Sequence, residues 1–297
     1  MPTEKFDILV ILREVSDPRP PARTTTRGAG IDERGLRRLP NPADLAALEE
    51  ALRLKDGLKA TVTVLAIGPA RLDDMLRLAF SLGADRGIRF WDHGMEGGDA
   101  LADARVLARI TGILAPTLVL TGSRLADRGD DPVPALAAAL NGAPCVSAAV
   151  SLTPQAGGVE VLRKGDRGSR QTVSAPFPCT VLCEEGSTPR YHSVAAVVAS
   201  LTLPIECWKL PELGLPFWEV GSLGASLPAA RVGTPRPDPV RAVTPDPTLP
   251  AFERIISLLS GGITAREGRV QALAADATAE ALWELFRAEG LVPGAAA

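Results

Sequence analysis

The chain of 297 residues is poor in aromatic side chains, in net charge and in long apolar runs, and each shortage excludes a class of protein. Aromatic residues make up 4% of the sequence and the formal net charge is -3, so we expect neither a basic face nor a stacking platform for nucleic acid. The first apolar run, in MPTEKFDILVILREVSD, is too short for a signal peptide or a membrane span and has acidic residues on both sides. The sequence therefore predicts a cytoplasmic protein that binds no nucleic acid and does not insert into a membrane.

Cysteine and histidine are also scarce. The four cysteines are Cys145, Cys179, Cys183 and Cys207, and the two histidines are His93 and His192. The sequence has no CxxC pair of the kind used by zinc sites and thioredoxin-like enzymes, and neither histidine stands in a nucleophile motif. We therefore expect buried structural thiols, no metal site and no catalytic residue.

Strand-like apolar runs alternate with amphipathic helical segments over the first 122 residues. Strands are predicted at residues 6–14, 60–68, 86–91 and 116–122, and helices, with their caps, at 41–57, 69–83 and 99–114. The first helix has Asn41 as N-cap, Pro42 at its first position and Gly57 just past its end. Strands separated by helices form parallel βαβ units with right-handed crossovers. The pattern predicts a doubly wound, mostly parallel α/β sheet with helices on both faces.

In such a sheet the ligand crevice lies beyond the carboxyl ends of the strands. Residues 12–17, Gly68 with Pro69, and residues 121–131 stand at those ends, and small residues there let a ligand approach the backbone. Neither GxGxxG nor GxxxxGK[ST] is present, which excludes a dinucleotide Rossmann fingerprint and a Walker loop. A nucleotide site and ordinary polar βα turns both remain open on these features.

Several segments, taken in order, resemble one known family. They are ILVILREVSDP, NPADLAALEEALRLKDG, IGPARLDDMLRLAFSLGADRGI, LVLTGSRLAD, the run through TPRYHSV, and PIECWKLPELGL. Their order and spacing resemble the β subunit of electron transfer flavoproteins, from the first strand to about Gly214. The resemblance implies an adenine nucleotide α-hydrolase-like fold with a C-terminal extended arm.

The resemblance implies a redox carrier and not an enzyme that transforms a substrate. The family works as an αβ heterodimer in which FAD lies mainly in the α subunit, while the β subunit shields the flavin and holds AMP. Electrons arrive from a flavoprotein dehydrogenase and leave toward a membrane quinone oxidoreductase, and we expect a non-bifurcating member. A stand-alone adenine-nucleotide-binding regulatory module and a scaffold subunit with a decayed nucleotide site are the alternatives.

The matching motifs imply particular cofactor-binding positions. These are Ile11, Arg13, Asn41, Ile67, Gly68, Thr121, Gly122, Asp127, Gly129, Asp130 and Val133. The loop DRGDDPVP departs from the family, because Pro132 and Pro134 lack backbone donors and Asp131 adds negative charge beside any phosphate. We therefore predict weak AMP binding, helped if Arg124 or Arg128 offsets that charge.

Two positions concern the flavin. Pro18 and Ala43 stand where some relatives of the family place aromatic residues, so a flavin contact from this chain would be aliphatic. Ordinary loop and first-turn positions are the alternative for both residues.

A segment at residues 184–204 corresponds to the part of the family that recognises the dehydrogenase. Tyr191 and Val194 are the predicted partner-binding residues, with Val194 as the anchor. On pattern alone, helical spacing of apolar residues favours a core stripe made of Val194, Val197, Val198 and Leu201.

The organisation changes after the predicted nucleotide-binding domain, residues 1–210. Residues 211–250 contain RVGTPRPDPVRAVTPDPTLP, in which prolines alternate with charges, so we predict an extended linker. Residues 251–297 contain two short amphipathic helices, too small to fold alone. The resemblance implies that this helical arm packs on the α subunit.

Overall fold

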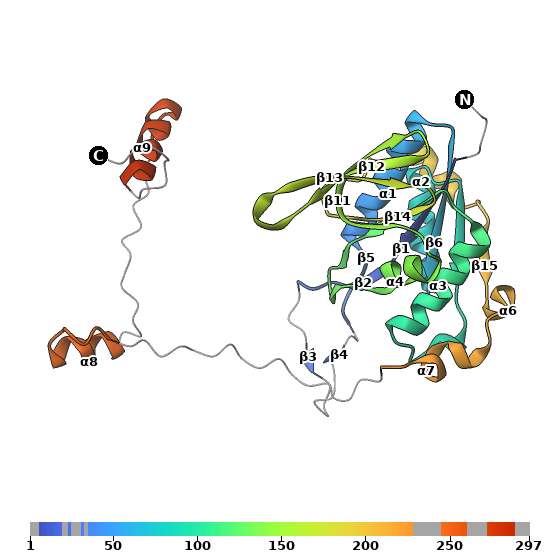
Figure 1. Ribbon diagram of the computed structural model, residues 1–297, viewed down its shortest axis with the longest axis horizontal. Coiled ribbons are helices and arrows are strands. Elements are labelled where there is room, and N and C mark those ends of the chain that lie inside the picture. The colour runs from blue at the N-terminus through green and yellow to red at the C-terminus, as the bar shows by residue number, and fades with distance from the viewer. Residues whose placement is uncertain are drawn as a thin grey trace. The chain divides into compact units, whose positions relative to one another are not determined.

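The computed structural model describes residues 6–19, 23–24, 31–32, 35–227, 245–259 and 272–288. The chain divides into two compact units, Met1–Thr234 and Pro235–Ala297. The first unit contains the sheet and its helices (Figure 1). No helix in the described ranges is long and apolar enough to cross a membrane.

The main sheet has nine strands within the described residues, in the order β13-β12-β11-β14-β8-β1-β6-β7-β15. The strands are β1 Phe6–Leu12, β6 Ala60–Ile67, β7 Arg86–Phe90, β8 Leu118–Gly122, β11 Cys145–Gln155, β12 Gly158–Lys164, β13 Arg170–Pro176, β14 Cys179–Cys183 and β15 Ile205–Trp208. All neighbours pair in parallel except β11 with β12 and β12 with β13. The predicted doubly wound, mostly parallel sheet is confirmed.

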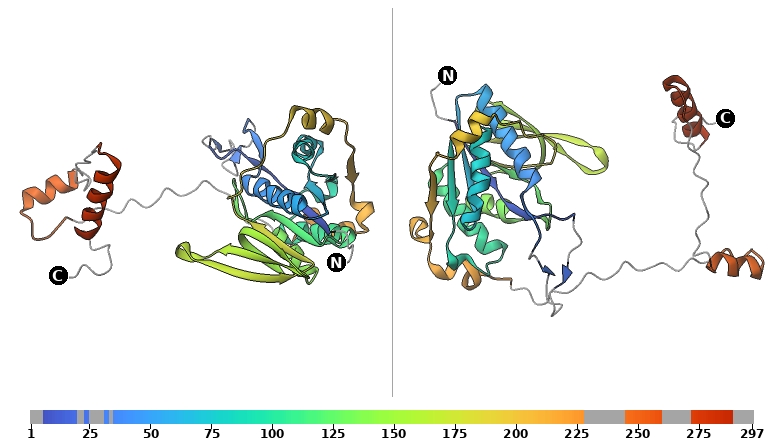
Figure 2. Two further views of the ribbon diagram at one scale, coloured as in Figure 1. Left: turned by 90° about the horizontal axis from the view of Figure 1, so that it is seen from above. Right: turned by 180° about the vertical axis from the view of Figure 1, so that it is seen from behind.

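Helices lie on both faces of this sheet (Figure 2). They are α1 Pro42–Gly57, α2 Asp73–Leu82, α3 Ala100–Leu114, α4 Val133–Leu140, α5 Val194–Ser200, α6 Leu210–Leu213 and α7 Gly221–Gly224, with 3-10 turns η1 Ala70–Leu72, η2 His93–Met95, η3 Asp166–Gly168 and η4 Phe217–Glu219. Three short strand pairs accompany them: β2 Glu14–Ser16 with β5 Arg38–Pro40, β3 Arg23–Thr24 with β4 Ile31–Asp32, and β9 Arg124–Leu125 with β10 Gly129–Asp130.

Strand β1 lies in the interior of the sheet, between β8 and β6, and is buried on both sides. Ile8, Val10 and Leu12 face the core beneath α1 and α2. Leu9 and Ile11 face the opposite core beneath α3 and α4. A continuous apolar run instead of an alternating one is what a strand covered on both faces requires.

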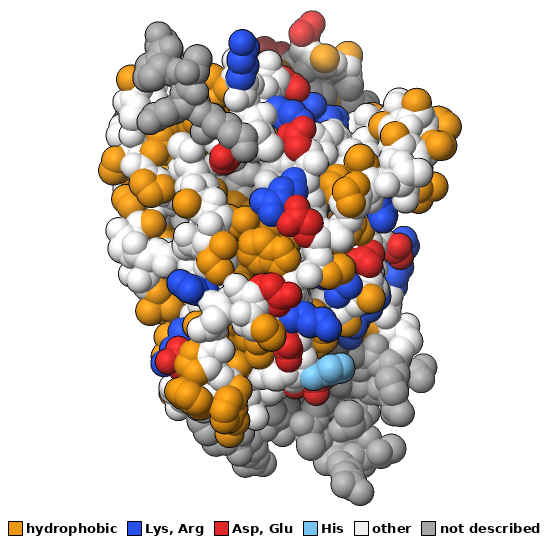
Figure 3. Space-filling model, turned by 90° about the vertical axis from the view of Figure 1, so that its right-hand side faces the viewer, with side chains coloured by type: hydrophobic (Ala, Val, Ile, Leu, Met, Phe, Trp, Pro, Cys, Tyr) orange, Lys and Arg blue, Asp and Glu red, His pale blue; other side chains and the backbone are white. Residues whose placement is uncertain are grey.

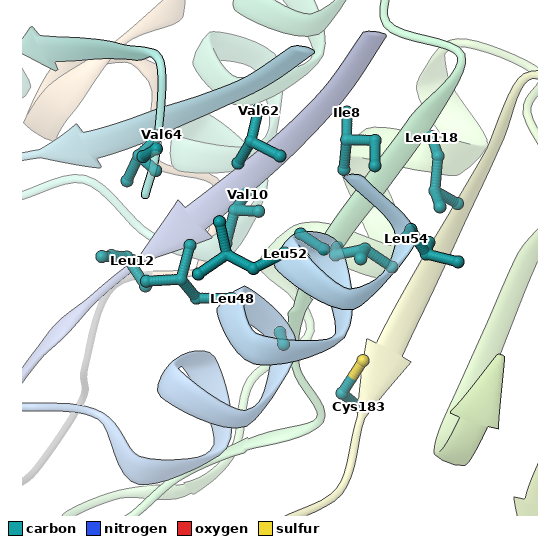
Figure 4. Packing of buried hydrophobic residues seen from close by; sticks show 14 of the residues in the cluster. Ile8, Val10, Leu12, Leu48, Leu52, Leu54, Val62, Val64, Leu118 and Cys183 are labelled. Atoms are coloured by element: carbon teal, nitrogen blue, oxygen red, sulfur yellow. The ribbon is translucent and has the colours of Figure 1, made fainter. Parts of the chain in front are cut away.

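Helix α1 is anchored by leucines on one face (Figure 4). Leu48 and Leu52 are each 1% exposed and pack with Val10 and Ile8 of β1. Each such leucine contributes about 1.5–3 kcal/mol of burial free energy. The helix ends at Gly57, one residue later than predicted, and Leu58 is its C-cap.

The first unit continues past residue 210, where the linker was predicted to begin. Leu213 and Val220 are 0% and 1% exposed and pack in the core beneath α3. Apolar side chains spaced along this segment give it enough buried surface to remain part of the folded unit. Residues 228–244, in the middle of the predicted linker, lie outside the described residues.

The face of the first unit that carries β15, α6 and α7 keeps some aromatic side chains at the surface. Phe217 and Trp218 are both more than half exposed and meet edge to face, with ring centroids 5.1 Å apart. Figure 3 shows hydrophobic side chains interspersed with charged ones on this face.

The second unit contains two helices in its described part, α8 Ala251–Leu259 and α9 Ala275–Ala288. Both were predicted as amphipathic helices, and both are present. Their large apolar side chains are about half exposed or more, among them Phe252 on α8 and Trp283 on α9. The packing of these helices on another subunit stays a prediction.

The cysteines divide into two groups. Cys179 and Cys183 are buried, and burial raises the pKa of the Cys179 thiol to about 11. Cys145 and Cys207 are exposed, so the prediction that all four are buried was wrong for these two. Cys207 lies on β15, the edge strand of the sheet, and Cys145 is the first residue of β11. A strand-like apolar run does not guarantee burial at such positions.

Candidate functional site

A cavity of about 550 Å³ lies at the carboxyl edge of the sheet, where β1, β6 and β7 end. The predicted cofactor-binding residues that line it are Ile11, Arg13, Ile67, Gly68 and Val133. Its volume falls within the range of small-molecule sites. The cavity therefore lies at the carboxyl ends of the strands, where the sequence predicted a ligand crevice.

Arg13 organises the floor of the cavity. Its Nε and Nη2 donate to the two carboxylate oxygens of Asp44, at 3.0 and 2.5 Å. Nη2 also donates to the carbonyl oxygen of Gly122 at 2.8 Å, and Nη1 donates to Asp131 Oδ2 at 2.5 Å. The guanidinium thus joins the end of β1 to α1, to the end of β8 and to the loop before α4.

Asp44 is the buried partner of this arginine, with no exposed side-chain surface. Its carboxylate also accepts hydrogen bonds from the backbone N–H of Arg13 at 2.8 Å and of Gly122 at 2.7 Å. The hydroxyl of Thr121 lies 3.2 Å from Asp44 Oδ1 and from the carbonyl oxygen of Ile11. Thr121 and Gly122 therefore hold the buried carboxylate of Asp44 beneath the cavity, and neither residue lines the cavity.

Close packing explains the glycine at position 122. A Cβ there would lie 2.5 Å from the Cβ of Ala43 and 2.7 Å from Asp44 Oδ1. Ala43 itself is 0% exposed. Ala43, one of the two predicted flavin-facing residues, therefore has no accessible surface, because its side chain fills the junction of α1 and β8. Pro18, the other one, is exposed.

The loop between β8 and α4 is shaped by two more predicted site residues. Asn41 does not cap α1 with its side chain; its Nδ2 donates to the carbonyl of Arg124 at 2.8 Å, and its Oδ1 accepts from the N–H of Ala126 at 3.1 Å. Asp127 Oδ2 accepts from the N–H of Ser16 at 2.9 Å. Both side chains hold the loop, and neither is among the described residues that line the cavity.

The tip of this loop is the β9–β10 hairpin. Gly129, with φ of +84°, and Asp130 are exposed there. Arg124 pairs with Glu184 at 2.8 Å, and Arg128 lies 3.9 Å from Asp127. The described contacts of Arg124 and Arg128 are thus with Glu184 and Asp127, and not with Asp131, whose charge either arginine could have offset.

Residues that the sequence analysis did not single out complete the cavity wall. Trp91, Met95, Leu107 and Asp103 all line it. Asp103 lies in the first turn of α3 and not at a strand end, and no motif marks it. Burial raises the pKa of Asp103 to about 6, with further contributions from the nearby charges of Asp131 and Asp99.

The raised pKa of Asp103 has a consequence for stability. The pKa of the Asp103 carboxyl is 3.8 ordinarily and about 6 in the folded protein, so the folded protein binds the carboxyl proton more tightly than the unfolded chain does. The ionised carboxylate therefore destabilises the fold above pH 6. We expect Asp103→Asn to raise the melting temperature at pH 7, and this gain to shrink as the pH falls from 6 toward 4. Thermal unfolding of both proteins across this range measures it. A gain that is independent of pH would contradict the assignment.

The predicted partner-recognition segment is anchored to α1 by its arginine. Arg190 donates from Nε to Glu49 Oε2 and from Nη2 to Glu49 Oε1, both at 3.1 Å, and it pairs with Asp56 at 2.9 Å. The adjacent Tyr191 is 100% exposed and Val194 is 81% exposed. The core-stripe interpretation of Val194 was wrong, because α5 packs on α2 through residues such as Ser200.

A mostly parallel, doubly wound sheet with a ligand-sized crevice at its carboxyl edge defines an α/β protein of the type that binds small molecules at that edge. Residues 29–213 match the electron transfer flavoprotein domain family. The chain therefore belongs to the electron transfer flavoprotein family, in the group of β subunits and FixA-like proteins.

Relatives from three bacteria illustrate the match. The chain is 30% identical over 238 residues to electron transfer flavoprotein subunit beta of Mycobacterium leprae, covering 78% of this chain and 89% of the relative. It is 32% identical over 200 residues to the protein of the same name from Bradyrhizobium diazoefficiens, covering 67% and 79%. It is 28% identical over 247 residues to protein FixA of Sinorhizobium fredii, covering 80% and 86%.

Proposed function

We propose that this chain is the β subunit of a heterodimeric electron transfer flavoprotein that carries electrons from a flavoprotein dehydrogenase toward a membrane quinone oxidoreductase. Family membership over residues 29–213 is the observation that carries the proposal. The proposed setting is the cytoplasm, and the proposed partners are an α subunit and the two redox proteins.

The proposed cofactor is FAD, held mainly by the α subunit. When bound, FAD supplies the redox chemistry, and the protein positions and shields it. On this chain the exposed Pro18 fits an aliphatic contact with the flavin. The proposal includes AMP in this crevice, bound weakly, because Arg13 already pairs with Asp131 and Pro132 and Pro134 carry no N–H.

The proposed carrier is non-bifurcating for a related reason. A second FAD in this crevice would bring a pyrophosphate, with two negatively charged groups, to the same floor. The cavity is lined by four carboxylates, Glu14, Glu96, Asp103 and Asp131, and by four arginines, Arg13, Arg38, Arg71 and Arg128. The wall therefore offers no excess of positive charge to a pyrophosphate.

Production of this chain with and without its α subunit tests the proposed function. We expect the heterodimer to be yellow with FAD and the isolated chain to be colourless, because one subunit alone leaves the flavin pocket incomplete. The visible spectrum and the nucleotides released on denaturation are the measurements. Stoichiometric flavin on this chain alone would refute the proposal that the α subunit holds most of the FAD. Failure to form a heterodimer would favour a stand-alone module.

Val194 tests the docking of the dehydrogenase. We expect Val194→Ala to weaken binding by about 1–2 kcal/mol, roughly tenfold, because it removes apolar surface from a contact pocket. The melting temperature should barely change, since the side chain is 81% exposed. Electron-transfer kinetics against the dehydrogenase and thermal unfolding measure the two effects.

Val64→Ala is the matched control, because Val64 of β6 is 0% exposed. It should lower the melting temperature and leave the affinity for the dehydrogenase unchanged in the folded fraction. If Val194→Ala behaves like Val64→Ala, the docking role does not apply to this chain.

A further inference from the structure

We propose that a second cavity of this chain, between the sheet and helices α3 and α4, binds an uncharged, mostly apolar ring compound that carries one hydrogen-bonding group. The cavity has a volume of about 1000 Å³. The proposal rests on the lining and the hydrogen bonds of this cavity, and it does not depend on the proposed redox function.

The cavity reaches the amino edge of the sheet, whereas the crevice described above lies at the carboxyl edge. Phe6 at the start of β1, Thr117 just before β8 and Pro178 just before β14 all line it. Residues of the two covering helices line its other side, among them Gly112 of α3 and Ala138 of α4. The space is therefore enclosed by strand starts and by two helices.

Small side chains on the covering helices leave this space unfilled. Helix α4 has the sequence VPALAAAL, and its Ala137 and Ala138 are 3% and 4% exposed. Alanine has a single side-chain carbon, which is too short to fill the gap between a helix and a strand. On α3, a Cβ at Gly112 would meet no other part of the chain within 4 Å. Because protein interiors are otherwise close-packed, a space of this size is available to a ligand.

The wall of this cavity carries no charge. Among the described residues that line it, none is an aspartate, glutamate, lysine, arginine or histidine. The carboxyl-edge crevice, in contrast, is lined by four arginines and four carboxylates, although Ile11, Leu107 and Pro134 line both spaces. Moving a charged ligand from water to a wall without opposite charges is costly. The second cavity therefore selects an uncharged ligand.

Thr180 supplies a hydrogen-bonding group inside the cavity. The residue is 5% exposed, and its hydroxyl makes no hydrogen bond to another described residue. Thr180 pairs with Val119, which packs beneath α3 and α4, whereas the next residue, Val181, packs in the opposite core. The hydroxyl therefore points to the side of the sheet that α3 and α4 cover. A buried hydroxyl without a partner costs free energy, which a polar group of a ligand would recover.

The other threonine, asparagine and glutamine side chains of the described wall already have hydrogen-bond partners. Nδ2 of Asn141 donates to Oγ1 of Thr111 at 2.8 Å. Oγ1 of Thr117 accepts from a backbone N–H of β1 at 3.4 Å, and Nε2 of Gln155 donates to a carboxylate of β12 at 3.0 Å. The hydroxyl of Thr180 is therefore the group to which the polar atom of the ligand bonds.

The amino-edge end of the cavity suits a ring. Phe6 and Phe177 both line it, and their rings meet edge to face with centroids 5.2 Å apart. Aromatic rings pack well against further rings in offset or edge-to-face contacts. Apolar and aromatic surface with one placed polar group is typical of sites for small molecules.

Fluorescence titration of the full chain with two matched dyes tests the proposal. N-phenyl-1-naphthylamine is uncharged and has one N–H, and 1-anilinonaphthalene-8-sulfonate adds a negative charge to the same rings. We expect the uncharged dye to bind at a single site, at least about tenfold more tightly than the charged dye. Thr180→Val keeps the shape of the side chain and removes the hydroxyl, so it should weaken binding of the uncharged dye by about threefold to tenfold.

Two filling variants locate the bound dye. Gly112→Phe and Ala138→Phe place a ring in the cavity, and each should weaken binding of the uncharged dye by about tenfold or more. Melting temperatures show whether each variant folds. Gly112→Phe keeps the test decisive if Ala138→Phe does not fold, because the new side chain starts in open space and replaces a helical glycine.

Two controls separate this cavity from other apolar surfaces. A Cβ at Gly57, in α1, also meets no other part of the chain within 4 Å, but Gly57 does not line the cavity. Gly57→Phe should therefore leave the affinity for the uncharged dye unchanged. Phe252→Ala, at an exposed position of α8, should also leave it unchanged, because it removes apolar surface from the arm alone.

Several outcomes would overturn the proposal. They are no binding of the uncharged dye by the wild type, equal affinity for the two dyes, unchanged binding in a folded filling variant, and loss of binding in Phe252→Ala. Release of the dye when the α subunit is added, or when the chain self-associates, would assign the cavity to a protein contact and would also overturn it. Failure to form a heterodimer that holds FAD would contradict the proposed function and would leave the dye result unaffected.

Discussion

Asp44→Ala should lower the free energy of unfolding by about 3–5 kcal/mol, the usual cost of removing one partner from a buried ion pair. The side chain has no exposed surface, and it accepts hydrogen bonds from the guanidinium of Arg13 and from two backbone N–H groups. Its loss removes the acceptor of both backbone N–H groups and of the Nε of Arg13 where α1, β1 and β8 meet. Since whole domains are stable by about 5–15 kcal/mol, this loss is a large fraction of the total stability. Urea denaturation measures the difference.

Asp74→Ala is the matched control for this prediction. Asp74 also stands in the first turn of a helix, α2, but its side chain is exposed. We expect a change within about 0.5 kcal/mol. Equal destabilisation by both variants would mean that Asp44 acts only on its helix terminus and not as the centre of the buried network.

Deletion of Phe252 to Ala297 should leave the α/β unit folded and weaken assembly with the α subunit by about a hundredfold or more. The compact unit Met1–Thr234 contains the sheet and both cores without this segment. The arm helices α8 and α9 instead expose large apolar side chains, among them Phe252, Ile255 and Trp283, which are 73%, 55% and 49% exposed. Burial of such side chains against a partner is a strong source of affinity.

The dissociation constant of the heterodimer and the melting temperature of the truncated chain are the two measurements. Trp283→Ala should reproduce part of the loss, whereas Glu284→Ala, at the next position of α9, should not. An unchanged dissociation constant after truncation would contradict the role of the arm, and a large fall in melting temperature would mean that the arm stabilises the α/β unit itself.

The order of strands and helices was largely predictable because local patterns determine it. The run Phe6–Leu12 is apolar at every core-facing position, and the helix after Asn41 begins with Pro42 as its capping pattern predicts. The extent of the first unit was less predictable. Leu213 and Val220 belong to the core, but they lie among short helices and turns, interrupted by Pro211, Gly214 and Pro216, where no long apolar period marks a core element.

The site was predictable only in part. Strand ends indicated Ile11, Ile67 and Gly68, and these line the crevice. Thr121 and Gly122 come from an equally clear strand end but face the buried carboxylate of Asp44. The direction of a side chain at a strand end depends on which residues pack beneath it. The spacing of motifs in the sequence carries no information about that packing.

The sequence by itself determined the class of protein: an α/β chain of the electron transfer flavoprotein family, with a crevice at the carboxyl edge of its sheet and two amphipathic helices near its end. Only the tertiary structure decided the use of individual side chains. It brought Arg13 to Asp131 across 118 positions and Arg190 to Glu49 across 141, and it left Val194 exposed where helical spacing favoured burial. Helix and strand patterns depend on near neighbours, whereas ion pairing and exposure depend on residues that only the folded chain brings together.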